Sequence, residues 1–158
     1  MEINQSGPEL ALRWQRIEIF PMNDPLAEWN FSRSLCELSQ WEAEFAQIAI
    51  AEYKKFMFLK SIFPEETLLP AQIVDTVWHL HLLYTRSYQE LCTALGSEFI
   101  DHDPRHSRRF NQQEHLDRYF RTMELYQRVF GQEPPTFIWG PKPIQDFNSD
   151  DLLPSEPA

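Results

Sequence analysis

Apolar residues recur at three- and four-residue steps over three long stretches of the chain, which is the spacing of an amphipathic helix. The stretch 41–63 carries two apolar stripes, so its helix is expected to pack on two sides and to lie centrally. The same spacing predicts helices over about 71–95 and 111–130. These end at Gly96 and Gly131, because glycine takes the left-handed conformation with little strain.

Two further signals predict where helices begin. Asp24 followed by Pro25 has the form of an N-cap and a first helical residue, and it predicts a helix over about 25–38. Ser39 and Glu42 have the S-x-x-E spacing of a capping box, in which each side chain accepts a hydrogen bond from the other residue's backbone amide. This box predicts the start of the central helix.

The two ends of the chain carry weaker patterns. Residues 1–24 favour neither a helix nor a strand and are predicted to be irregular. Residues 140–158 form an acidic, proline-rich tail that is predicted to be flexible, after an apolar cluster at 137–139 that is expected to dock on the core. The predicted fold class is all-α, a compact bundle of about four or five helices in a single domain, residues 1–139.

The charge balance bears on the partners. The chain has 24 acidic and 14 basic residues and a formal charge of -10, which argues against nucleic acid or an anionic membrane surface. A basic protein or a cation fits better. The alternative is that the acidic surface only keeps the protein in solution.

Several classes of chemistry lack their usual signals. Cys36 and Cys92 stand far apart and in no C-x-x-C motif, so no disulfide framework or thiolate zinc site is indicated. There is no Gly-x-Ser-x-Gly motif and no phosphate-binding glycine loop, and Ser87 has no evident base partner. The sequence does not indicate an enzyme. Without a secretory signal or a long apolar run, a cytoplasmic location is the default expectation.

Two histidines stand close together in the predicted helix over 71–95. Positions two apart on a helix point about 160° away from each other, so His79 and His81 cannot share one metal ion. His81 falls on the apolar stripe that runs from Val74 through Thr85 to Cys92, and we expect a buried histidine that bonds a backbone carbonyl or a tyrosine.

His79 has a different neighbour. Asp75 lies one helical turn earlier, and a carboxylate beside an imidazole serves as half a metal site or as an acid/base pair. The loop 99–110 follows the same helix and can fold back along it with further ligands. The candidates in that loop are His102 first, with Asp101, Asp103 and His106 in reserve. The alternative is a surface ion pair that anchors the loop.

The run Val-Asp-x-x-Trp-His-x-His-x-Leu-x-Thr-x-x-Tyr-x-x-x-Cys over residues 74–92 resembles the signature of the glycine-rich-domain-like proteins. Weaker matches extend the resemblance over about 40–139. Its structural signature residues here are Trp78, His81, Thr85, Tyr88 and Cys92. Only His102 matches the two adjacent histidines that the family often has, and no glycine-rich segment is present. The resemblance implies a signalling or interaction role and no known activity.

Three functional hypotheses follow. The first is a protein–protein interaction or adaptor module, acidic and helical. The second is a protein that binds a divalent metal such as zinc, with a possible metal-dependent activity, through Asp75, His79 and His102. The third is an immunity-like protein that masks a basic effector. A separation of His79 and His102 beyond about 8 Å excludes a shared metal ion, since metal–ligand bonds are near 2 Å.

Overall fold

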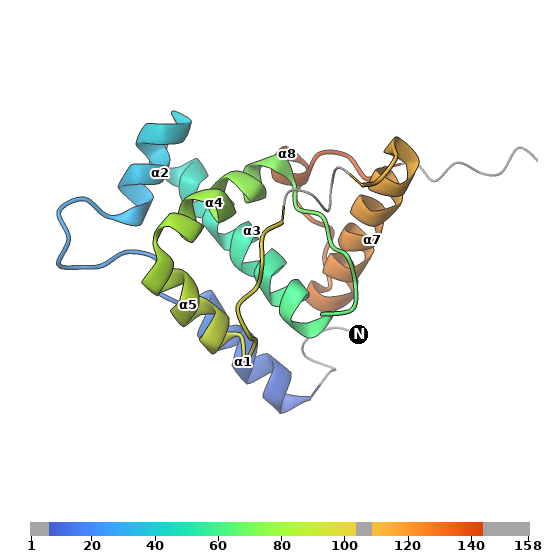
Figure 1. The fold of residues 1–158 in the computed structure, drawn as a ribbon, viewed down its shortest axis with the longest axis horizontal. Coiled ribbons are helices and arrows are strands. Elements are labelled where there is room, and N and C mark those ends of the chain that lie inside the picture. Colours follow the sequence, from blue (N-terminus) through green and yellow to red (C-terminus); the bar gives the residue numbers. More distant parts are fainter. Residues whose placement is uncertain (1–6, 104–108, 144–158) are drawn as a thin grey trace, which may run out of the picture.

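The computed structural model describes residues 7–103 and 109–143, and within these ranges it has seven helices and no strand (Figure 1). The helices are α1 (Pro8–Glu18), α2 (Phe31–Ser39), α3 (Ala43–Ile62), α4 (Gln72–Leu83), α5 (Thr85–Ala94), α7 (Gln112–Phe130) and α8 (Thr136–Trp139). The all-α fold is confirmed, with more helices than the four or five expected. A single domain over 1–139 stays a prediction, and the tail beyond residue 143 lies outside the described residues.

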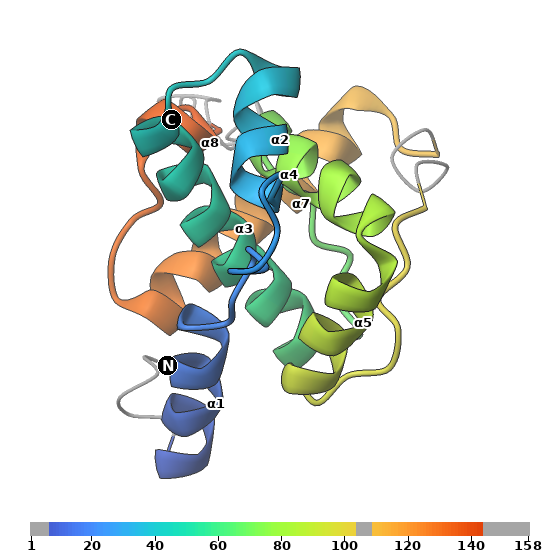
Figure 2. The same ribbon diagram turned by 90° about the vertical axis from the view of Figure 1, so that its left-hand side faces the viewer.

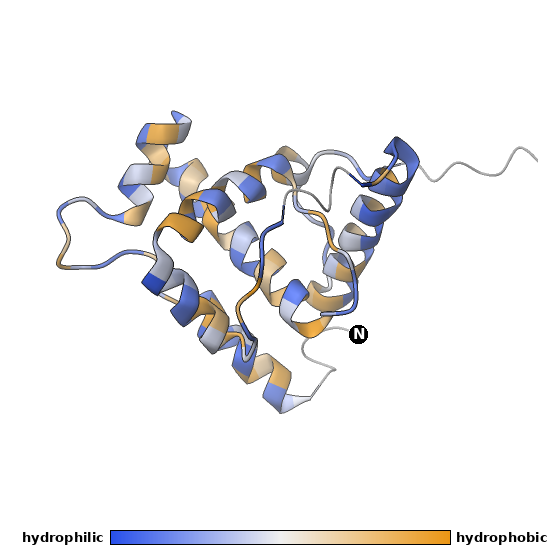
Figure 3. Cartoon of the chain, in the orientation of Figure 1, coloured by the Kyte–Doolittle hydropathy of each residue, from blue (hydrophilic) through white to orange (hydrophobic). Residues whose placement is uncertain are grey.

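Helix α3 is the central element, as its two apolar stripes predict. It packs against α1, α2, α4 and α7. In Figures 1 and 2 it runs through the middle of the molecule, with α4 and α5 on one side and α7 on the other. Its fully buried side chains are Ala46, Ala49, Tyr53, Phe56, Met57, Phe58 and Leu59. The outer side of α7 is hydrophilic, so α7 is an amphipathic cover for this core (Figure 3).

We expected residues 1–24 to be irregular, but part of this region is helical. Residues 8–18 form α1, with Pro8 at the first helical position, where its missing N–H costs nothing. Ile17 is fully buried, and the Trp14 ring meets Phe58 and Phe130 edge-on at centroid distances of 5.3 and 5.0 Å. Packing on α3 and α7 therefore stabilises a helix whose own apolar pattern is too short to be distinctive.

Both predicted start signals are wrong. The Asp24 carboxylate accepts a hydrogen bond from the Leu26 amide at 2.9 Å and makes a local turn, so α2 begins only after Asn30. Ser39 is the last residue of α2, which ends with Gln40 in the left-handed conformation, φ 55°. The S-x-x-E spacing thus spans a helix end, and α3 begins after it at Ala43.

The predicted helix over 71–95 is two helices that meet at Tyr84, whose backbone has φ -87° and ψ 62°. The Tyr84 hydroxyl hydrogen bonds the Ser34 hydroxyl of α2 at 2.8 Å, and His81 Nε2 lies 2.9 Å from Ser87 Oγ across the break. These tertiary bonds hold a bend that no glycine or proline marks. The stop at Gly96 is confirmed, with φ 69°.

The C-terminal elements follow the sequence more closely. Helix α7 begins with a capping box of Asn111 and Glu114 and ends at Gly131, φ 71°. In the predicted docking cluster, Ile138 and Trp139 are buried but Phe137 is 59% exposed. The cluster docks through the short helix α8.

A buried carboxylate holds α8 in place. Glu52 of α3 accepts hydrogen bonds from Trp139 Nε1 at 2.8 Å, Tyr126 Oη at 3.1 Å and Lys55 Nζ at 3.0 Å.

None of the described helices combines the length and apolar character that crossing a membrane requires.

Candidate metal centre

Asp75 and His79 lie one turn apart at the start of α4. Asp75 is in the first turn, where the positive end of the helix dipole favours a carboxylate. Its Oδ2 lies 3.3 Å from His79 Nε2. The predicted pairing of these two side chains is therefore present.

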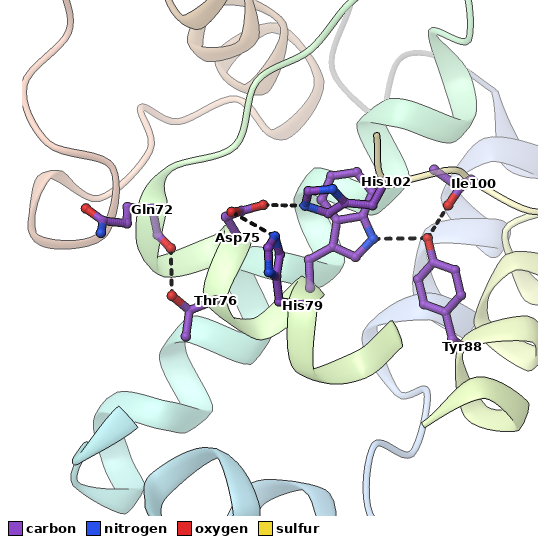
Figure 4. A network of polar contacts seen from close by, with 8 residues as sticks. Gln72, Asp75, Thr76, His79, Tyr88, Ile100 and His102 are labelled. Carbon is purple, nitrogen blue, oxygen red and sulfur yellow. Dashed lines mark hydrogen bonds and ion pairs between the residues drawn. The ribbon is translucent and has the colours of Figure 1, made fainter. Parts of the chain in front are cut away.

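His102 joins the pair from the segment that follows α5. Residues 97–103 run back along α5 towards α4 (Figure 1). His102 Nε2 lies 2.7 Å from Asp75 Oδ1, and its ring centroid is 4.4 Å from that of His79 (Figure 4). Among the described residues, one ligand atom from each of Asp75, His79 and His102 lies within 4.8 Å of the others. This is well inside the limit set for a shared ion.

Two of the signature residues position His102. The Tyr88 hydroxyl accepts a hydrogen bond from Trp78 Nε1 at 3.0 Å and donates one to the Ile100 carbonyl (Figure 4). Burial raises the pKa of Tyr88, so it remains a donor. The Trp78 ring packs on the His102 imidazole at a centroid distance of 4.1 Å. The segment that carries His102 is thereby tied to both α4 and α5.

Cys92 and Thr85, two of the other three signature residues, have different environments. Cys92 is buried, and burial raises the pKa of its thiol, which disfavours the reactive thiolate. Thr85, which we expected on the core stripe, is exposed at the first position of α5. Tyr88 and Cys92, which lie further along the predicted stripe, are buried, so the stripe continues into α5 and Thr85 alone leaves it.

The three candidate ligands open onto a cleft of about 670 Å³. Its walls come from the end of α3, the connection 63–71, the start of α4, the segment 101–103 and α7. The side chain of His102 is 12% exposed, that of Asp75 35% and that of His79 60%, so the site is closed on the His102 side and open at His79.

The reserve ligands are placed less directly. Asp101 and Asp103 also line the cleft, but in the described part of the chain they are not in the cluster that could hold an ion. His106 lies outside the described residues. Sequence reasoning missed Lys60, which lines the same cleft. The sequence signal that could have pointed to Lys60 is its position as a charged residue at the end of the apolar run 56–59 of the central helix.

His81 is a buried structural histidine that bonds a tyrosine, as predicted. Its Nδ1 lies 2.7 Å from Tyr53 Oη. Tyr53 has no other hydrogen-bond partner in residues 7–103 and 109–143, so its proton goes to Nδ1 and the histidine carries its own on Nε2. Burial, with nearby Lys54, lowers the pKa of His81 to about 4, so the ring is neutral at pH 7.

The structure also corrects the expectation that Ser87 has no possible base partner beside it. A histidine does lie beside it, at 2.9 Å, which the sequence did not show because the contact depends on the break between α4 and α5. However, because Tyr53 donates to Nδ1, the ring proton lies on Nε2, which then donates to Ser87 Oγ. It therefore cannot act as a base for a serine nucleophile.

Comparison with known protein families identifies the family of this chain. No curated protein and no solved structure matches the chain. A family model, UCP032817-like, matches residues 15–134, and no glycine-rich-domain-like family is found. The resemblance drawn from residues 74–92 is therefore wrong, and the aromatic and histidine residues there are explained by their local contacts instead. The chain belongs to the UCP032817-like family.

Proposed function

We propose that this protein binds one divalent transition-metal ion, zinc in the first instance, through Asp75, His79 and His102. The observation that carries the proposal is the convergence of the three ligand atoms within 4.8 Å at the side of an open cleft. Two imidazoles and one carboxylate are a ligand set that zinc and ferrous iron accept, with at least one coordination position left for water or a ligand.

The distances from Asp75 to the two imidazoles are close to those of such a site, and they involve its two different oxygens, so Asp75 would bind through both oxygens or turn to present one. Zinc–ligand bonds of about 2.0–2.1 Å place neighbouring tetrahedral ligands about 3.3 Å apart. Asp75 Oδ2 and His79 Nε2 are already 3.3 Å apart. Asp75 Oδ1 and His102 Nε2 are at hydrogen-bond distance, 2.7 Å, and move apart by roughly 0.6 Å when an ion replaces the proton between them.

A loop anchor is the alternative use of the same residues. The Asp75–His102 hydrogen bond by itself ties residues 97–103 to α4. That role makes no use of His79, whose side chain is 60% exposed and lies against the same carboxylate. Metal binding accounts for all three side chains and for their opening onto the cleft.

Metal content and affinity test the proposal. We expect the purified protein to bind one zinc per chain in elemental analysis and in calorimetric titration. His79→Ala and His102→Ala each weaken binding by at least about 100-fold, since each removes one of three ligands. His115→Ala is the matched control, because His115 lines the same cleft outside the triad. If zinc does not bind, or binds equally well to His79→Ala, the proposal is wrong and the loop anchor stands.

We propose an interaction module as the second candidate function. It is supported by the connection 19–30, which projects from the helical body in Figure 1 and carries Leu26, 94% exposed, and Trp29, 53% exposed. An adaptor or immunity-like protein with a basic partner also fits the net charge of -10. Pull-down at low and high salt tests this candidate, because an electrostatic complex weakens as salt screens the charges. Partners held equally at both salt concentrations contradict a charge-driven complex.

A further inference from the structure

Lys60 places a positively charged side chain in the cleft beside the candidate metal centre. It lies in the last turn of α3, with its Nζ 5.5 Å from the centroid of the Trp78 ring and 5.9 Å from that of Phe56. No carboxylate among the described residues forms an ion pair with it. Burial lowers the pKa of Lys60, because the charged form loses part of its solvation there.

Trp78 contacts both Lys60 and the candidate ligand His102. The same indole that lies under Lys60 Nζ packs on the His102 imidazole. Lys60, Asp75, His79 and His102 all line the one cleft. A small molecule in the cleft is therefore surrounded by walls that carry both this cation and the three candidate ligands.

We propose that the cleft binds a small monocarboxylate, with one oxygen on the metal ion held by the triad and the other accepting a hydrogen bond from Lys60. This inference rests on the proposed metal site. An ionised carboxylate supplies two acceptor oxygens, one for each of these groups, and an ammonium offers three donors. The bound anion also gives Lys60 an ion-pair partner, which no carboxylate in residues 7–103 and 109–143 is.

The remaining charges of the cleft favour a single negative charge on the ligand. Asp101 and Asp103 lie on its wall, and Glu66 lines it as well, although Glu66 is paired with Arg121 at 2.8 Å. Repulsion from these carboxylates grows with the charge of the ligand. A phosphate, with a charge between one and two at neutral pH, is therefore expected to bind more weakly than a carboxylate.

The test uses the full chain loaded with cobalt(II), whose visible spectrum reports a change of ligand at the metal. Acetate is titrated as the probe, with inorganic phosphate in parallel. We expect acetate to change the spectrum of the wild type. Lys60→Gln should bind the metal with unchanged affinity but acetate about tenfold more weakly, the loss of one charged hydrogen bond. Lys142→Gln is the control, because this exposed lysine also lies over an aromatic ring, Phe120 at 4.8 Å, and does not line the cleft.

The outcomes separate the two proposals. If metal binds but acetate binds equally to the wild type and Lys60→Gln, the role of Lys60 is refuted and the metal site stands. If phosphate binds more tightly than acetate, the carboxylate assignment is wrong. If no metal binds to the wild type, the proposed function fails and the carboxylate site fails with it.

Discussion

The buried carboxylate of Glu52 offers a quantitative test of how the C-terminal helix is held. Glu52 is 4% exposed, and its two oxygens accept from Trp139, Tyr126 and Lys55. Glu52→Gln keeps the shape of the side chain but replaces one acceptor oxygen with an NH₂ donor. Whichever way the amide is turned, a donor then faces a donor.

The expected cost follows from these contacts. The Trp139 Nε1–Oε2 bond is fully buried and charge-assisted, and such a bond contributes about 1.5–3 kcal/mol. The Lys55 side chain is 18% exposed, so solvent screens part of its attraction, and its loss adds about 1 kcal/mol or less. We expect Glu52→Gln to lower the free energy of unfolding by about 3 kcal/mol.

Equilibrium unfolding in urea, followed by tryptophan fluorescence and by circular dichroism, measures this change. Glu44→Gln is the matched control, since it removes an exposed glutamate from the same helix and should change stability by about 0.5 kcal/mol or less. Trp139→Phe added to Glu52→Gln should cost less than the sum of the two single changes, because both remove the same bond. A Glu52→Gln protein within about 0.5 kcal/mol of the wild type refutes the view that this network holds α8.

Two further substitutions test the environment of the candidate site. Tyr53→Phe removes the donor to His81 Nδ1 in the core and should lower the free energy of unfolding by about 1–2 kcal/mol in urea titration, whereas an unchanged midpoint contradicts the assigned hydrogen bond. Tyr88→Phe removes the hydroxyl that ties the Ile100 carbonyl to Trp78, so we expect zinc affinity to fall about tenfold at unchanged stoichiometry in calorimetric titration. Equal zinc affinity in the wild type and Tyr88→Phe shows that the segment bearing His102 is held by other contacts.

The features that followed from sequence are those with a strong local pattern. The two apolar stripes of the stretch 41–63 require a helix covered on two sides, and α3 has that position. The glycine stops at Gly96 and Gly131 have the expected left-handed backbone. The one-turn spacing of Asp75 and His79, with a loop that follows the same helix, was enough to predict that His102 could join them, and the three residues do form one cluster.

The features that sequence did not show depend on contacts between distant residues. The bend at Tyr84 is held by Ser34, which is 50 positions away in the chain, and no local residue type marks it. The same bend moves Thr85 out of the core stripe and brings Ser87 to His81. The capping signals at Asp24 and Ser39 failed for a different, local reason, because both side chains suit turns and helix ends as well as helix starts.

X-ray absorption spectroscopy of the zinc-loaded protein tests the central claim most directly, because it reports which atoms bind the metal. We expect two imidazole nitrogens and a carboxylate oxygen at about 2.0–2.2 Å, with a further light-atom ligand, and a loss of imidazole scattering in His79→Ala. A sulfur ligand at about 2.3 Å, or a shell without imidazole, contradicts a site made by Asp75, His79 and His102.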